Sequence, residues 1–329
     1  MIHLFREPWS KDMGQLGFAE AFVSSRLGRN ERLDALHGLV DWVPVAAIVG
    51  RLRTGEMGRP PYEPLSMVQA LYLQALYDLS DRGLEEALLD RLSFRRFCGF
   101  ALDRETPDET TLCRFRKLAS EQQVLQACFE EITRQLAARG LVARKGTLMD
   151  ATIVKARHNR PPVAAGRGAA HPREPEAGWT VKGGKSHFGY KLHIGMDSGG
   201  LVRRAVFTSA AVYESEAADA LICGDETAVY GDKAYEQKAR RARLAAMRIK
   251  DRTMRRANRW HRELRYWHRV RNRLIARRRA PVEAAFSTLK RHYGFARARY
   301  ASLAGNAMRA FAALTMLNLL RARTKLANP

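Results

Sequence analysis

Apolar residues in the first 145 positions recur at the spacing of α-helices. In the run PLSMVQALYLQALYDLS, which begins at Pro64, one stripe repeats at intervals of three and four residues, and a proline suits the first turn of a helix. The members of this stripe are Leu65, Val68, Tyr72, Leu76 and Leu79. Ser80 can cap the next helix, and Gly140 is placed to end the last one. We therefore predict an all-helical N-terminal domain over residues 1–145.

A later helix start in this region carries a basic face. Thr106 is the expected N-cap, with Pro107 in the first turn and Glu109 completing a capping box. The outward positions of the helix that follows are Arg114, Arg116 and Lys117. Three short helices before a basic helix are typical of a helix-turn-helix module, whose last helix enters the major groove. A solvated face on an all-helical domain explains the same pattern, so both interpretations stay open.

After the helical region the pattern changes to that of β-strands. The segments TLMDATIV, HFGYKLHIGM and LVRRAVFTSA read as strands, and a turn at residues 197–200 joins the last two. Between the first two lies a stretch rich in Pro, Gly and Ala, residues 159–179, which predicts a long surface loop. A helix near residues 215–223 and a short strand ending at Asp232 follow. This order predicts an α/β domain over residues 146–329.

The composition indicates a folded protein with a polyanionic partner. Lys and Arg total 57 against 34 for Asp and Glu, a net charge of +23, while 46% hydrophobic residues suffice for ordinary cores. The N-terminal residues lack the apolar run of a signal peptide, and Asn306, Arg309 and Asn318 interrupt the late apolar stretch, so we expect no membrane span. The four cysteines form no C-x-x-C pair and are expected to be reduced core thiols of a cytosolic protein.

The most biased segment lies between Lys238 and Arg279. It holds 18 Lys or Arg against two acidic residues, which leaves +16 of the chain's +23. Because sixteen net like charges repel one another without an anionic partner, we predict a basic helical segment, about residues 236–280, that binds DNA, over the alternative of a solvated charged helix. Trp260 and Trp267 interleave with the charges. Their spacing of seven residues favours packing in a core, and stacking on a base unpaired at a DNA end is the alternative.

Three acidic residues are candidates for phosphodiester chemistry. Asp150 lies inside an otherwise apolar strand, where a carboxylate is costly to bury unless it is paired or bound to a metal ion. Asp232 ends the strand AVYGD, and Glu283 lies on a helix that Pro281 is expected to open, on the same face as Lys290. Two-metal cleavage needs hard oxygen ligands that converge from separate elements. These three acids therefore form the candidate site.

Other motifs near these acids receive ordinary structural interpretations. GGKS at residues 183–186 lacks the first glycine of a phosphate-binding loop, whose position holds Trp179, so no nucleotide cofactor is expected. Asp197 and Glu214 are read as hairpin and helix-start residues, with a supporting role beside the acids as the alternative.

The chain resembles the DDE transposases of bacterial insertion sequences, in particular the branch typified by insertion sequence five. The segment from Arg59 through DETTLCRFRKL is similar to that branch's helical N-terminal domain. MDATIVKA, WTVKGGKSHFGYKLHIG, VYGDKAY and VEAAFSTLKRHYGFARARY follow the order of its catalytic domain. The resemblance assigns the acidic triad to Asp150, Asp232 and Glu283. It also implies an RNase H-like fold, a mixed sheet flanked by helices, behind an all-α DNA-binding domain. The basic segment is then an insertion before the helix that carries Glu283.

The family also has a signature of Tyr, Arg, Glu and Lys around its last acid. Arg279, Glu283 and Lys290 match its spacing, whereas the tyrosine position holds Ala276, so that contact is not carried over. By resemblance we expect two Mg²⁺ ions, replaceable by Mn²⁺, at the triad. The expected DNA contacts are Arg279, Lys290, Lys233, Arg114, Arg116, Lys117, Trp260, Trp267, Arg297 and Arg299.

The resemblance implies a transposase that binds the terminal inverted repeats of its own insertion sequence, cleaves the element ends and joins the 3′-hydroxyls to target DNA. A homodimer on paired ends is expected, in the bacterial cytoplasm and associated with the nucleoid. Two alternatives stay open: a non-catalytic DNA-binding protein, either a decayed transposase or a helix-turn-helix regulator, and a stand-alone RNase H-like nuclease. Inverted repeats and short target duplications around the gene would favour the transposase over both.

Overall fold

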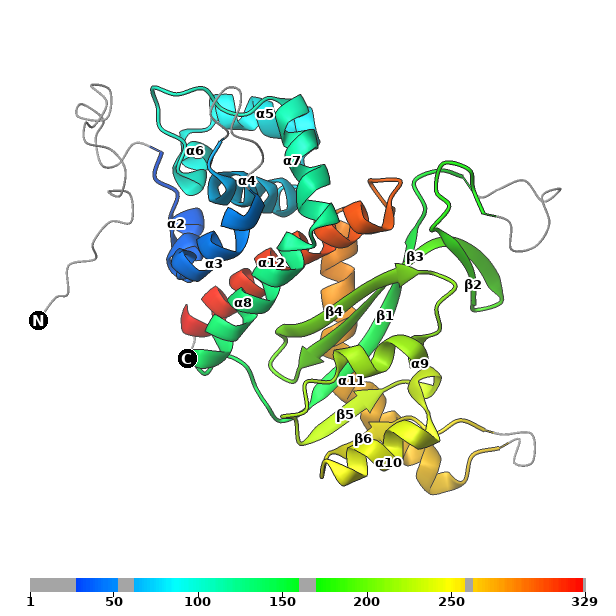
Figure 1. Ribbon diagram of the computed structural model, residues 1–329. Helices are drawn as coiled ribbons and strands as arrows, with labels where there is room; N and C mark the ends of the chain where they lie inside the picture. The colour runs from blue at the N-terminus through cyan, green and yellow to red at the C-terminus, as the bar shows by residue number, and fades with distance from the viewer. Residues whose placement is uncertain (1–27, 53–61, 160–169, 258–262, 328–329) are drawn as a thin grey trace, which may run out of the picture.

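The computed structural model describes residues 28–52, 62–159, 170–257 and 263–327. Helices from the N-terminal part of the chain gather on one side, and a β-sheet with helices on both faces forms the other (Figure 1). A mixed sheet with flanking helices is therefore joined to a helical region, in agreement with the α/β prediction.

The N-terminal region contains helices and no strand in its described residues, as predicted. Ser80 caps one of these helices by accepting a hydrogen bond from the Gly83 N–H at 2.9 Å. Gly140 follows the last of them with a φ of +73°, a conformation that glycine adopts without steric cost. Both predicted boundaries are confirmed. The helices are α2 (Glu31–Gly38), α3 (Trp42–Val49), the 3₁₀ turn η1 (Gly50–Leu52), α4 (Pro64–Leu76), α5 (Asp81–Asp90), α6 (Leu92–Cys98), α7 (Glu109–Glu121) and α8 (Val124–Ala138).

The start of the basic helix differs from the prediction. α7 begins at Glu109, and its N-cap is Asp108, whose carboxylate accepts a hydrogen bond from the Thr111 N–H at 2.6 Å. Thr106, the predicted cap, is buried two residues earlier, and its backbone carbonyl accepts from the Tyr62 hydroxyl. An aspartate carries a full negative charge to the positive end of the helix dipole, which favours it over threonine as a cap.

α4 and α12 (Leu303–Ala327) form the centre of the helical region. α4 is buried around its whole circumference from Ser66 to Leu76, and α12 packs against α4, α7 and α8. One hydrophobic cluster continues from these helices into the sheet. The helical region is therefore built from both ends of the chain. Of its thiols, Cys98 and Cys128 are buried as expected, whereas Cys113 is exposed.

Among the described helices, α12 is long and apolar enough to cross a membrane, yet 78% of its most apolar window is buried inside the protein. The pair Glu31–Gly38 and Trp42–Leu52 passes the same test of length and composition only as one span bent by 78°. Asn318 of α12 accepts from the Val202 N–H at 2.9 Å and donates to its carbonyl at 2.7 Å. These contacts identify α12 as a core helix.

The sheet has six strands of mixed direction. β1 pairs with β3 antiparallel and with β5 parallel, β5 pairs with β6 parallel, and β3 also pairs with β2 and β4 antiparallel. The predicted strands at β1, β3, β4 and β5 and the turn at residues 197–200 are confirmed. β2 lies at the end of the predicted loop, of which residues 160–169 fall outside the described residues. The strands are β1 (Thr147–Lys155), β2 (Gly178–Lys182), β3 (Lys185–Asp197), β4 (Val202–Ser209), β5 (Ala228–Gly231) and β6 (Lys250–Thr253).

Helices cover both faces of the sheet (Figure 1). α11 (Tyr266–His292) and α12 pack on the face that carries Leu148, Leu192 and Ile194. The opposite face carries Met149 and Val229, which pack with residues of the remaining short helices. These are η3 (Ala218–Leu221), η4 (Lys233–Tyr235) and α10 (Lys238–Ala246), and α9 (Glu214–Ala217) packs against η3 and η4.

The predicted basic insertion does not form a separate element. Its residues are divided among α10, the edge strand β6 and the N-terminal half of α11. α11 also continues unbroken through Pro281, where a helix start is predicted. Buried residues recur at intervals of four, three, four and three residues before and after Pro281. Packing against the sheet therefore holds the helix on both sides of the proline. These buried residues are Ile275, Arg279, Val282, Phe286 and Leu289.

Candidate active site

The first two predicted acids lie on neighbouring parallel strands. β1 pairs with β5 in a register that sets Leu148 opposite Tyr230. The same register two residues further places Asp150 beside Asp232. Asp232 follows β5 directly and caps η4 by accepting a hydrogen bond from the Ala234 N–H at 2.6 Å. Strand pairing alone therefore brings two carboxylates together.

Asp150 is paired with a buried arginine of α11. Nη2 of Arg279 lies 2.7 Å from Oδ2 of Asp150, and the exposed fractions of the two side chains are 8% and 19%. Burial raises the pKa of Asp150, Arg279 acts in the opposite direction, and the charge of Asp232 adds to the increase. The pKa of Asp150 lies above its ordinary value as a result. A carboxylate in this setting needs a nearby cation to stay ionised.

Glu283 lies one helical turn beyond Arg279 on the same side of α11. Four residues correspond to about 6 Å along a helix and about 40° around its axis. α11 packs along β1, with Arg279 beside Asp150 and with Lys290 close enough to Lys155 for that charge to lower the pKa of Lys290. Glu283 on α11 therefore lies beside the part of β1 that is about two residues beyond Asp150. It is exposed and forms no hydrogen bond or ion pair with the residues that the structure describes.

The three carboxylates lie on adjoining elements without forming a closed metal site. Within the described ranges, no group of three or more His, Cys, Asp or Glu side chains is close enough to hold a metal ion. The donors nevertheless suit Mg²⁺, which prefers carboxylate oxygens and keeps several water ligands. The guanidinium of Arg279 also shows that the Asp150 carboxylate accepts a cation at this position. The residues present therefore fit a divalent cation at Asp150 and Asp232.

Lysines border the acids on the side of β2. Burial and the charges of Lys182 and Lys155 lower the pKa of Lys290, and Lys182 also acts on Asp150. All three lysines are exposed, and within the described part of the chain none of them forms an ion pair. Like charges that gather without a counter-charge attract an anion.

Two features of this centre were missed from the sequence. Lys182 ends β2, and a turn through Gly183 and Gly184, both with positive φ, leads into β3. A Gly-Gly pair between two short runs is typical of a hairpin, so a signal was present at GGKS. Tyr235, three residues after Asp232, is buried and had no comparable signal.

The predicted DNA contacts separate into exposed and buried residues. Arg116 is wrong as an exposed residue, because it lies four positions after Leu112 on the packed side of α7, where it pairs with Asp81. Arg299 is also occupied, since it donates to the carboxylate of Asp78 and to neighbouring backbone carbonyls. The predicted DNA contacts whose side chains are exposed are Arg114, Lys117, Lys233, Trp267, Lys290 and Arg297.

Trp267 does not lie in a core. Trp267 is 75% exposed, and its ring meets that of Tyr266 edge-on at 5.2 Å. The predicted core role of Trp267 is wrong, because the side chain is exposed and belongs to neither hydrophobic cluster of the described residues. Trp260 lies outside the described residues.

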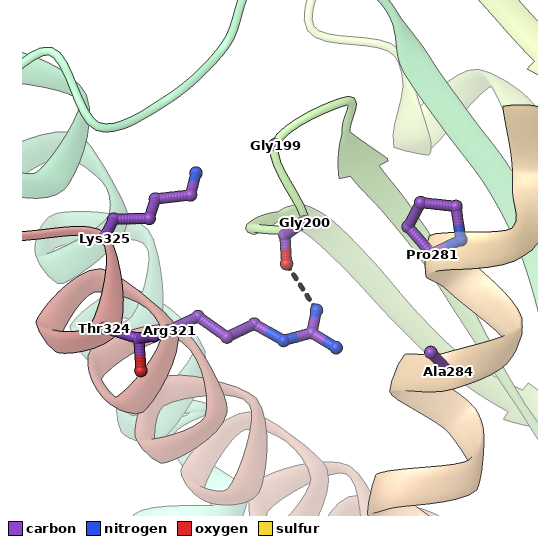
Figure 2. Close-up of a pocket in the computed structure, with 7 residues that line it drawn as sticks. All are labelled: Gly199, Gly200, Pro281, Ala284, Arg321, Thr324 and Lys325. Carbon is purple, nitrogen blue, oxygen red and sulfur yellow. Dashed lines mark hydrogen bonds between the residues drawn. The ribbon is translucent and has the colours of Figure 1, made fainter. Parts of the chain in front are cut away.

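A separate hollow of about 350 Å³ lies on another side of α11 (Figure 2). Pro281 and Ala284 line it together with the turn at residues 199–200 and the end of α12, from which Arg321 donates to the Gly200 carbonyl. Pro281 and Ala284 lie about 100° or more around the helix axis from Glu283. The hollow is therefore distinct from the acids.

Two family profiles match the chain. The profile described as Transposase DDE domain covers residues 143–319, more than half of the chain, and contains all three candidate acids. The profile described as Transposase domain (DUF772) covers residues 22–118, most of the helical region. No solved structure matches the chain significantly.

Proposed function

Because the chain belongs to the family of transposases with a DDE domain, the metal-dependent enzymes of insertion-sequence transposition, we propose that Asp150, Asp232 and Glu283 are its catalytic triad. One observation carries this assignment: the register of β1 and β5 sets two of the acids side by side, under the helix that carries the third. The Asp150–Arg279 pair supports it, because a buried acid that already accepts a cation suits metal binding.

The motifs of the catalytic domain support membership of the branch typified by insertion sequence five. On this proposal the protein binds the terminal inverted repeats of its own element, cleaves the element ends and joins the freed 3′-hydroxyls to target DNA. It acts as a homodimer on paired ends, because two ends are handled together, and it works in the bacterial cytoplasm in association with the nucleoid.

The acids would hold two Mg²⁺ ions, which Mn²⁺ could replace. Asp150 and Asp232 would contribute ligands to both ions, and Glu283 would contribute to one of them. When bound, the ions lower the pKa of the attacking water or 3′-hydroxyl and offset charge on the phosphate. Arg279 and Lys290 hold phosphates near the scissile bond, a task that suits a guanidinium and an ammonium on one helix face. For Arg279 this requires release from Asp150.

Further DNA contacts come from two surfaces. Lys182 and Lys155 extend the cationic border beside Lys290. The exposed arginines of α11 before Arg279 form the second surface, with Trp267 among them. Neither set of charges is neutralised by the fold, which favours phosphates as partners.

A gel assay with a labelled element end and Mg²⁺ or Mn²⁺ tests the proposal. Asp150→Asn, Asp232→Asn and Glu283→Gln each remove a metal-binding oxygen, so we expect cleavage to be abolished. The Lys and Arg side chains are unchanged in these variants, so we expect DNA affinity to be unchanged. Asp103→Asn, an exposed acid of the helical region, is the control and should cleave normally.

Near-normal cleavage by any of the three variants would remove that residue from the site. Cleavage by the wild-type protein without joining to target DNA would favour the stand-alone nuclease instead. DNA binding without cleavage in either metal would favour the non-catalytic binding protein.

A further inference from the structure

The hollow between α11, α12 and the turn at residues 199–200 is lined by two cations (Figure 2). The Arg321 guanidinium donates a hydrogen bond to the Gly200 carbonyl. The Lys325 ammonium, one helical turn further along α12, donates to the Leu141 carbonyl at 3.0 Å. A guanidinium has five N–H donors and an ammonium has three. Each cation is therefore held in place by a neutral carbonyl and keeps further donors for a ligand.

The hollow offers these cations little negative charge. None of the described residues that line it is acidic, and neither cation forms an ion pair within the described part of the chain. Asp197 is fully buried, and its carboxylate accepts two hydrogen bonds of 2.6 Å from backbone N–H groups. Burial lowers the pKa of Arg321, whereas Tyr293 and Asp197 act in the opposite direction. An anion in the hollow would therefore stabilise the two cations.

The wall formed by α11 is apolar. Pro281 and Ala284 form it, and their side chains contain only carbon beyond the backbone. The volume of about 350 Å³ lies near the lower end of the range for ligand pockets, about 300–1,000 Å³. A hollow of this size admits a short piece of one DNA strand and not a duplex. Cations on one wall and carbon atoms on the other suit a phosphate with its adjoining deoxyribose.

Exposed arginines continue from the hollow along α11. Arg277 precedes Pro281 by four residues and Ala284 by seven, so these side chains share a face of the helix. Arg273 lies about one turn before Arg277, and Arg291 follows Ala284 by seven residues. The three arginines are exposed. Cations therefore lie on both sides of the hollow along the helix, and a DNA strand that follows them passes over it.

We propose that Arg321 and Lys325 bind a phosphate of a DNA strand in this hollow. The inference rests on the DNA binding proposed above. The guanidinium and the ammonium donate to the phosphate oxygens, and Pro281 and Ala284 contact the adjoining deoxyribose. Because the hollow and Glu283 lie on different sides of α11, the contact anchors DNA away from the acids. It contributes to affinity and takes no part in the chemical step.

The first test measures the affinity for a labelled duplex over a range of salt concentrations. Ala284→Glu adds a carboxylate to the hollow and leaves both cations in place. We expect it to weaken binding by about tenfold, the effect of one charge-assisted hydrogen bond, and to flatten the slope of log K against log salt by about 0.9. Ala284→Gln has the same size without the charge and should keep the wild-type slope. Both variants should melt normally, because Ala284 is exposed and both replacements are good helix formers.

The second test removes the cations. Arg321→Gln combined with Lys325→Gln should also flatten the slope by about 0.9, since both side chains serve one phosphate. Arg323→Gln is the matched control, because Arg323 lies on the same helix, is exposed and does not line the hollow. It should keep the wild-type slope.

Equal slopes for Ala284→Glu and Ala284→Gln would overturn the inference, as would a wild-type slope for the double variant. An equal loss in Arg323→Gln would assign the effect to the overall charge of α12 and overturn it too. Cleavage of an element end by the wild-type protein would leave the proposed function intact in each case. A wild-type protein that does not bind DNA would reject the proposed function itself, and the inference with it.

Discussion

The two halves of α11 are held by different means. From Arg279 to His292 the helix buries a stripe of side chains against the sheet and its Arg279 pairs with an acid of β1. In the half that precedes Arg279, only Ile275 is buried among the described side chains, and Trp267 and Leu274 are exposed together with a series of arginines. The protein supports one half, and the other presents charges and rings to solvent.

The exposed half is not built for its own stability. Acidic residues favour the first turn of a helix because of its dipole, yet the first turn of α11 contains none, and arginines at positions 269, 271 and 273 follow closely. Arginines that repel each other and oppose the dipole are explained by an anionic partner. The comparison therefore separates two halves. The half that carries the proposed catalytic residues, called the catalytic half here, has Arg279 buried and paired with Asp150, whereas the half that carries the proposed DNA contacts, called the binding half, has exposed arginines without an acidic partner among the described residues.

The largest effect on stability is expected in the catalytic half. Arg279→Met leaves the Asp150 carboxylate buried without its partner, which destabilises a protein by about 3–5 kcal/mol. Denaturant unfolding of the metal-free protein at neutral pH measures this loss. Arg278→Met, one residue away and exposed, is the control and should change little.

The deficit of Arg279→Met should depend on pH. The pKa of Asp150 is already above its ordinary value in the folded protein, so its protonated form favours the folded state, and that contribution is lost as the pH rises through the folded pKa. Removing Arg279 raises this pKa further, because the arginine opposes the effect of burial. The deficit should therefore shrink as the pH falls from about 7 towards about 4. A deficit that is constant with pH, or one that persists unchanged with Asp150→Asn added, would show that the pair does not cause it.

An intermediate effect is expected in the binding half, on DNA affinity rather than stability. Replacing Arg269, Arg273, Arg277 and Arg278 by Gln should flatten the slope of log K against log salt by up to about 3.6, because each phosphate that is no longer neutralised lowers the slope by about 0.9. Four exposed cations elsewhere form the matched control set: Arg82, Arg104, Arg139 and Lys145. Equal slopes for the two sets would mean that this half of α11 does not face DNA.

The smallest effect is expected at Trp267. Because its side chain is 75% exposed, Trp267→Ala should melt at the wild-type temperature, in contrast to a buried tryptophan. If the ring stacks on a base opened at the element end, the variant forgoes about 1–3 kcal/mol of stacking, and a fully paired end is cut poorly. An end with a mismatch already opened at the cut should restore activity. Normal cutting of both ends would leave Trp267 without a role in the reaction, and a lower melting temperature would mean that it packs against protein.

Much of the fold was predictable because its signals are local. The stripe after Pro64, the cap at Ser80 and the turn at residues 197–200 each depend on neighbours within a few positions, and the structure has all three. The strand end at Asp232 followed from the same kind of pattern. Tyr235 is different, because no local pattern marks a buried hydroxyl that lacks a partner among the described residues.

Other features depended on partners that lie far away in the chain. Lys250–Thr253 has little strand character of its own and becomes β6 by pairing with β5, so a run of charges that reads as helix is divided between a strand and two helices. Arg116 lies four positions after the buried Leu112, on the packed side of α7, and only the presence of Asp81 on another helix makes it a buried ion pair.

The sequence by itself determined most of the elements, the excess of cations and the identity of the candidate acids, because periodicity, caps, composition and motifs are written along the chain. Tertiary structure alone decided which cations are free and which are paired, and it alone brought Arg279 to Asp150. The physical reason is that the free energy of a buried charge or hydroxyl depends on the groups packed around it, and those groups come from distant segments.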